Sequence, residues 1–158
     1  MLQRISQHTL SDLSAQAKDS PRLRKNLNFH TNNDAACHRL LNALEPGTYV
    51  QPHCHLSPDK EETLIVLAGR IGVLIFHADG SVAERFVLSP RENDFGVTIP
   101  STVFHSMVAL ESGSVFFEAK AGPYVAISDA EKASWAPTET DATSADYLQH
   151  MLQYFDTE

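Results

Sequence analysis

The chain has 158 residues, of which 42% are hydrophobic and 8% aromatic, and this composition is typical of one globular domain with an ample core. Its formal net charge of −8 argues against nucleic acids and acidic membrane surfaces as partners. No apolar run reaches the roughly 20 residues of a membrane-spanning helix, and the first residues do not resemble a signal peptide. Cys37 and Cys54 lack CxxC spacing, so we expect free thiols and a cytoplasmic protein.

The first expected element is a short helix over residues 8–19, with Thr9 as its N-cap. Ser20-Pro21 is expected to end this helix. Residues 22–30, RLRKNLNFH, then carry four cations when His30 is counted. They indicate either a solvated loop or edge strand, or an arm near a pocket in which Arg22 or Arg24 grips an anion.

Eight short strands are expected to follow, with turn signals every eight to twelve residues. They cover residues 38–44, 48–55, 63–68, 70–77, 82–88, 95–99, 103–110 and 115–120. Regular spacing of this kind predicts a mainly β protein, a sandwich or barrel of antiparallel strands. No helical pattern of ten residues interrupts this region, which argues against a βαβ fold.

The C-terminal part of the sequence turns helical. A capping-box pattern at Ser128–Glu131 predicts a helix that stops near Trp135, and Ser144 could cap a last helix. The last helix carries an apolar stripe that packs either on the barrel or on a second subunit, so a homodimer is one alternative. We divide the single domain into an N-terminal helix and basic arm (1–37), a β-barrel (38–125) and a C-terminal helical extension (126–158).

Residues 47–69, GTYVQPHCHLSPDKEETLIVLAG, carry the main chemical pattern. Side chains two positions apart on an extended strand share a face, so His53 and His55 aim two imidazoles at one spot. Glu62 opens the next strand and His105 follows a turn led by Pro100, so both can reach that spot. The alternative is a pair of exposed histidines, since the chain has eight.

Three imidazoles and one carboxylate suit a divalent transition metal such as iron, manganese, nickel, zinc or copper. Magnesium and calcium prefer oxygen ligands. The predicted metal ligands are therefore His53, His55, Glu62 and His105.

The stretch G-x5-H-x-H…E-x6-G resembles the first motif of the cupins, which are small jelly-roll barrels with a metal inside. Its positions are taken by Gly47, His53, His55, Glu62 and Gly69. The second cupin motif is matched by Pro100 and His105, whereas Asp94, Thr102 and Ala109 replace its two glycines and its Asn. Because Thr102 is not expected to take a positive φ as Gly can, we expect the turn of the second motif to differ.

A resemblance over nearly the whole chain is carried by RLRKNLNFH, HRLLNALEPGTYVQPHCH, EAKAGPYV and SWAP. These segments resemble the WbuC family of cupin-fold metalloproteins. The resemblance implies a cupin-type jelly-roll barrel, one divalent transition metal (Fe, Mn, Ni or Zn) and the four ligands given above. It also implies a link to surface-polysaccharide or nucleotide-sugar metabolism.

The leading hypothesis is a metalloenzyme acting on a small polar or anionic molecule inside the barrel. Arg22, Arg24 and His30 are the candidates for orienting a substrate anion, and Tyr49 and Tyr124 are expected near the barrel, where ordinary packing is the alternative. A rival hypothesis is a binding protein in which the metal docks a ligand and no bond is changed. A third is a structural metal in a closed tetrahedral shell.

Overall fold

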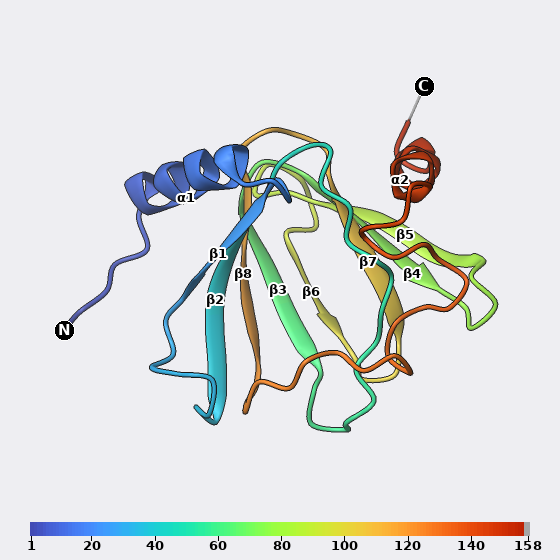
Figure 1. Ribbon diagram of the computed structural model, residues 1–158. Helices are drawn as coiled ribbons and strands as arrows, with labels where there is room; N and C mark the ends of the chain where they lie inside the picture. Colours follow the sequence, from blue (N-terminus) through green and yellow to red (C-terminus); the bar gives the residue numbers. More distant parts are fainter. Residues whose placement is uncertain (157–158) are drawn as a thin grey trace.

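A computed structural model describes residues 1–156 of the chain. Two antiparallel sheets face each other, and one helix covers the outer side of each (Figure 1). The elements in chain order are α1 (Gln7–Asp19), β1 (Arg24–Asn28), β2 (Cys37–Leu44), β3 (Glu62–Ala68), β4 (Ile71–Phe76), β5 (Val82–Leu88), β6 (Gly96–Ile99), β7 (Phe104–Ala109), β8 (Ser114–Ala121) and α2 (Ser144–Gln153). The strand orders are β1-β2-β8-β3-β6 in one sheet and β5-β4-β7 in the other.

The main core lies between the two sheets, because side chains alternate between the faces of each strand. Leu64 and Val66 of β3 pack there against Val73 of β4 and Met107 of β7. Glu62 and His105 stand at the same two-residue spacing on β3 and β7, and both are buried. Two polar side chains from opposite sheets therefore enter the interior at one end of the apolar core.

One helix packs on part of the outer face of each sheet. Leu10 and Leu13 of α1 pack on the five-stranded sheet, and Leu148 and Met151 of α2 pack on the three-stranded sheet. Burial of each of these side chains contributes about 1.5–3 kcal/mol. The N-cap of α1 is Ser6, and the predicted cap Thr9 is instead its capping-box partner three residues later.

Seven of the eight expected strands are confirmed as β2 to β8, and residues 24–28 form an edge strand, β1, that pairs with β2. The expected strand over 48–55 is wrong, because this segment makes only isolated bridges, from His53 to His105 and to Lys132. Pro52 has no N–H to donate, which prevents a continuous ladder. His53 and His55 nevertheless keep their shared orientation.

The helix expected from Ser128 to Trp135 is also absent from the described part of the chain, and turns take its place. Its backbone N–H and C=O groups bond to the histidine segment instead: Cys54 N–H donates to the Glu131 carbonyl at 2.8 Å, and Ala133 N–H donates to the Pro52 carbonyl at 2.9 Å. These bonds replace the hydrogen bonds that a helix would need.

The C-terminal helix is confirmed, and the division into 1–37, 38–125 and 126–158 stays a prediction, with residues 157–158 outside the described region. Within residues 1–156, no helix has the length and apolar character needed to cross a membrane.

Candidate functional site

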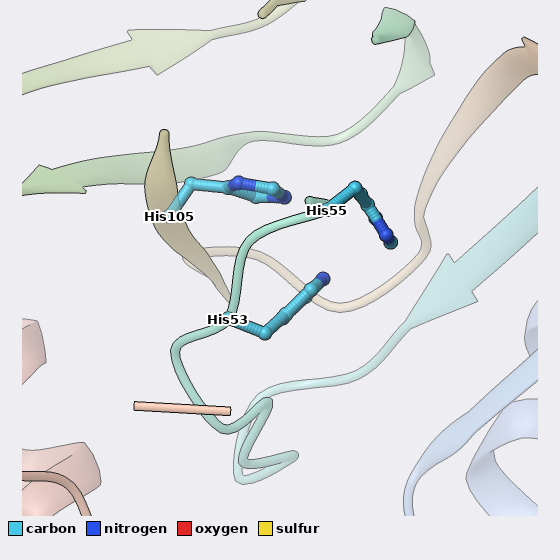
Figure 2. A group of neighbouring side chains, drawn as sticks. All are labelled: His53, His55 and His105. Carbon is cyan, nitrogen blue, oxygen red and sulfur yellow. The ribbon is translucent and has the colours of Figure 1, made fainter. Parts of the chain in front are cut away.

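Three histidine side chains converge inside the barrel (Figure 2). His53 and His55 come from the segment before β3, and His105 comes from β7. One ring nitrogen of each lies within 4.8 Å of the corresponding nitrogens of the other two. The backbones of His53 and His105 are paired as well, since His53 N–H donates to the His105 carbonyl at 3.1 Å and His105 N–H donates back at 2.9 Å.

Two of the rings are oriented by the carbonyl group two residues earlier in the chain. Nδ1–H of His53 donates to the Gln51 carbonyl, and Nδ1–H of His105 donates to the Val103 carbonyl, each at 2.9 Å. With the proton on Nδ1, each ring directs the lone pair of Nε2 toward the shared space. Metal-binding histidines are commonly oriented by such a second hydrogen bond.

Nε2 of His105 is buried and has no hydrogen-bond partner among residues 1–156, although it lies 3.3 Å from Oε2 of Glu62. Leaving such a buried polar atom unpaired costs about 1–3 kcal/mol. A cation bound between the rings would satisfy this nitrogen, so the residues present fit a transition metal in both their chemistry and their orientation.

Glu62 lies beside the imidazoles, at the start of β3. Its Oε1 accepts a hydrogen bond from Nε2 of His55 at 2.7 Å. Burial by itself raises the pKa of Glu62, but its contacts with His105 and His55 and the charge of Lys120 hold that pKa well below its usual value. The carboxylate is therefore ionised and available as a ligand.

Burial lowers the pKa of His53 to about 4, and the neighbouring His105 adds to this effect. The imidazole is consequently neutral near pH 7, which is the form that binds a metal.

Two neighbouring segments fix the backbone of the histidine pair. The Glu131 carboxylate accepts the N–H of Leu56 at 3.0 Å, and the N–H of Thr102 donates to the His55 carbonyl at 2.7 Å. Thr102 has a φ of +69°, so the expectation that it could not take a positive φ was wrong. The hydrogen bond to His55 offsets part of the conformational cost of about 1–2 kcal/mol.

A cavity of about 400 Å³ lies next to the histidines. Its lining includes His53, His55, Lys120, Tyr124 and Glu131. This volume is at the lower end of the range for small-molecule sites.

Lys120 and Glu118 are residues near the site that the sequence patterns did not reveal as functional. Both point inward from β8, where Nζ of Lys120 lies 2.9 Å from Glu118 and 3.3 Å from Glu62. Asn42 donates to the other Glu118 oxygen at 2.7 Å. The signal that could have found them is the alternation in EAKA, where charged residues occupy the inward positions of an otherwise apolar strand.

Arg22, Arg24 and Tyr49 lie apart from the histidines. They line a second cavity of about 370 Å³, which shares no lining residue with the first. Both guanidinium groups bond to the carboxylate of Glu139, and the Tyr49 hydroxyl donates to the Pro137 carbonyl at 2.8 Å. The structure therefore does not bring these residues to the predicted metal ligands, and a role in anion binding stays a prediction.

His30 packs against a residue that lines the first cavity. Its ring stacks on His38 with a centroid distance of 3.9 Å, and His38 rather than His30 lines the cavity. Tyr124 does line the cavity, with a largely exposed side chain.

Three comparisons bear on the family and the fold. A family model described as a domain of unknown function (DUF6016) matches residues 5–88. No curated protein matches the sequence. Among solved structures, KdgF from Halomonas sp. is 20% identical, with a TM-score of 0.51 over 67% of this chain and 84% of KdgF.

Two further structures are similar in fold. CapF, solved with the inhibitor 3-isopropenyl-tropolone, is 18% identical with a TM-score of 0.50, over 63% of this chain and 28% of CapF. A cupin superfamily protein from Desulfitobacterium hafniense is 10% identical with a TM-score of 0.47, over 62% and 76% of the two chains. The predicted cupin-type jelly-roll fold is confirmed by the two antiparallel sheets and by the likeness in fold to KdgF, whereas the resemblance to the WbuC family stays a prediction.

Proposed function

The chain belongs to the family of the domain of unknown function DUF6016, and we propose that it binds one divalent transition metal and acts on a small polar or anionic substrate beside it. The ligands in this proposal are His53, His55, Glu62 and His105. The observation that carries it is the buried, unpaired Nε2 of His105, which faces two other imidazoles and an ionised carboxylate.

A bound iron, manganese, nickel or zinc ion would supply Lewis-acid chemistry, polarising a carbonyl or hydroxyl group of the substrate. The protein's own residues prepare the site. The Gln51 and Val103 carbonyls hold two rings in one tautomer, and Glu131 and Thr102 fix the backbone between them. The adjacent cavity gives a small molecule access to the site.

The alternative function is a metal-dependent binding protein that changes no bond in its ligand. One observation favours it: several ionisable side chains of the cavity are already engaged. Glu131 accepts backbone N–H groups, Lys60 donates to two carbonyls, and Lys120 lies between two carboxylates. A general base needs an accessible lone pair, and these groups do not offer one freely.

The metal centre is tested by elemental analysis and by calorimetric titration with Fe²⁺, Mn²⁺, Ni²⁺ and Zn²⁺. We expect one ion per chain in the wild type and loss of most of it in His53→Ala and His105→Ala. His77→Ala, at an exposed histidine in the turn after β4, is the matched control and should retain the ion. Full metal content in both site variants would refute the assignment.

Enzyme and binding protein are separated by a substrate screen on the metal-loaded protein. The resemblance to the WbuC family supports including sugars and nucleotide sugars in the screen, together with small organic acids. Turnover that stops when the metal is chelated indicates an enzyme. Binding without turnover across the screen supports the alternative.

A further inference from the structure

An ammonium group stands at the floor of the histidine cavity. Lys120 of β8 pairs in register with His38 of β2 and with Glu62 of β3, so three inward side chains form one row across the sheet. Nζ of Lys120 contacts one oxygen of Glu118 and one of Glu62. An ammonium group has three N–H donors, so one remains for the cavity that Lys120 lines.

The formal charges of this floor depend on the metal. Glu62 and Glu118 carry two negative charges and Lys120 carries one positive charge, which leaves one negative charge without an ion. A divalent ion on the histidines changes this balance to one positive charge. The cavity lining also includes Lys60, Asp59 and Glu131; the charge of Lys60 offsets that of Glu131, and water screens the exposed Asp59. The metal-loaded floor therefore attracts an anion.

Part of the cavity lining is apolar. Pro123, Tyr124, Val125 and Ile127 form this part, and the side chains of Tyr124 and Val125 are 58% and 68% exposed. The backbone beneath them is held in place, since Nζ of Lys60 donates to the Ala121 and Pro123 carbonyls at 2.7 and 2.6 Å. A fixed wall that leaves apolar side chains exposed suits the apolar part of a ligand.

We propose that this cavity takes small carboxylic acids with an apolar body, the carboxylate pairing with Lys120 and the body lying on Tyr124 and Val125. This inference rests on the proposed metal centre. It narrows the substrate class from polar or anionic molecules in general to acids with an aromatic or branched aliphatic body. The volume of about 400 Å³ restricts the ligand to compact molecules.

The test is calorimetric titration of the Zn²⁺-loaded protein with phenylacetate. Phenylacetamide serves as the neutral counterpart, and acetate as the counterpart without an apolar body. We expect phenylacetate to bind at least tenfold more tightly than either, and the metal-free protein to bind it at least tenfold more weakly. Lys120→Met and Val125→Asp, each loaded with one Zn²⁺ per chain, should bind phenylacetate at least tenfold more weakly than the wild type, whereas Lys25→Met, on β1 outside the cavity, should not.

Three results overturn the inference while leaving the metal centre intact. They are failure of phenylacetate to bind the Zn²⁺-loaded protein, equal affinity for phenylacetamide, and wild-type affinity in both cavity variants. Failure of the wild type to bind any of the four metals instead overturns the proposed function. If Lys120→Met does not fold, Val125→Asp decides alone, because its side chain is exposed and its loss removes no core packing.

Discussion

Lowering the pH is expected to destabilise the metal-free protein through His53. The pKa of this imidazole is about 4 in the folded protein, against about 6.5 in the unfolded chain. The unfolded chain therefore binds more protons between these two values, and the free energy of unfolding falls as the pH falls through this window. The loss from this one group is about 2 kcal/mol at pH 5 and about 3 kcal/mol at pH 4, relative to pH 7.

The measurement is urea unfolding of the metal-free protein at several pH values between 7 and 4, for the wild type and for His53→Gln. Other groups also titrate in this range, so the informative quantity is the difference between the two free energies of unfolding as a function of pH. That difference should change by about 2 kcal/mol between pH 7 and pH 5. The exposed histidine in His8→Gln provides the control and should follow the wild-type curve.

A pH-independent difference between the wild type and His53→Gln would show that His53 does not bury a neutral imidazole. The ring would then be accessible to water in the folded protein and would not be held in the neutral, metal-binding form. Metal-loaded wild type should show the same trend more steeply, since protons compete with the ion for the ring nitrogens.

Two further predictions concern the scaffold around the site. Gly69→Ala should lower the free energy of unfolding by about 2–4 kcal/mol in urea, because a Cβ there would stand 2.6 Å from Cα of Ser114 at a φ of +75°. Gly113→Ala, with φ +79° and open space around its Cβ, should cost only about 1 kcal/mol, and equal costs would contradict this account. Glu131→Ala should speed amide exchange at Leu56 and weaken metal binding, and an unchanged exchange rate would show that the carboxylate does not hold this segment.

Much of the barrel could be predicted from the sequence, because alternation and turn residues are local signals. Glu62, at the start of one apolar run, and His105, after the turn led by Pro100, are expected from the sequence to reach the histidine pair, and both are buried beside it on β3 and β7. The strand expected over 48–55 does not form, because Pro52 lacks a donor and the segment makes isolated bridges instead. The histidines still converge because their own spacing and two single bridges suffice.

Other features could not be predicted because they depend on partners distant in the chain. Ser128–Glu131 has the pattern of a helix start, yet Glu131 bonds to Leu56 across the molecule. Arg22 and Arg24 form a cationic arm in the sequence. The fold shows that both guanidinium groups donate hydrogen bonds to the carboxylate of Glu139. Charge runs indicate what a segment can bind and leave open whether the chain itself supplies the partner.

The reciprocal backbone hydrogen bonds between His53 and His105 have a consequence for fragments of this chain. The segment matched by the family model, residues 5–88, contains His53, His55 and Glu62 and ends before β7. A fragment limited to that segment would lack both the third imidazole and the strand against which the first one is anchored. The proposed metal ligands therefore come together when the two sheets close on each other, and an ion bound between Glu62 and His105 would link the two sheets.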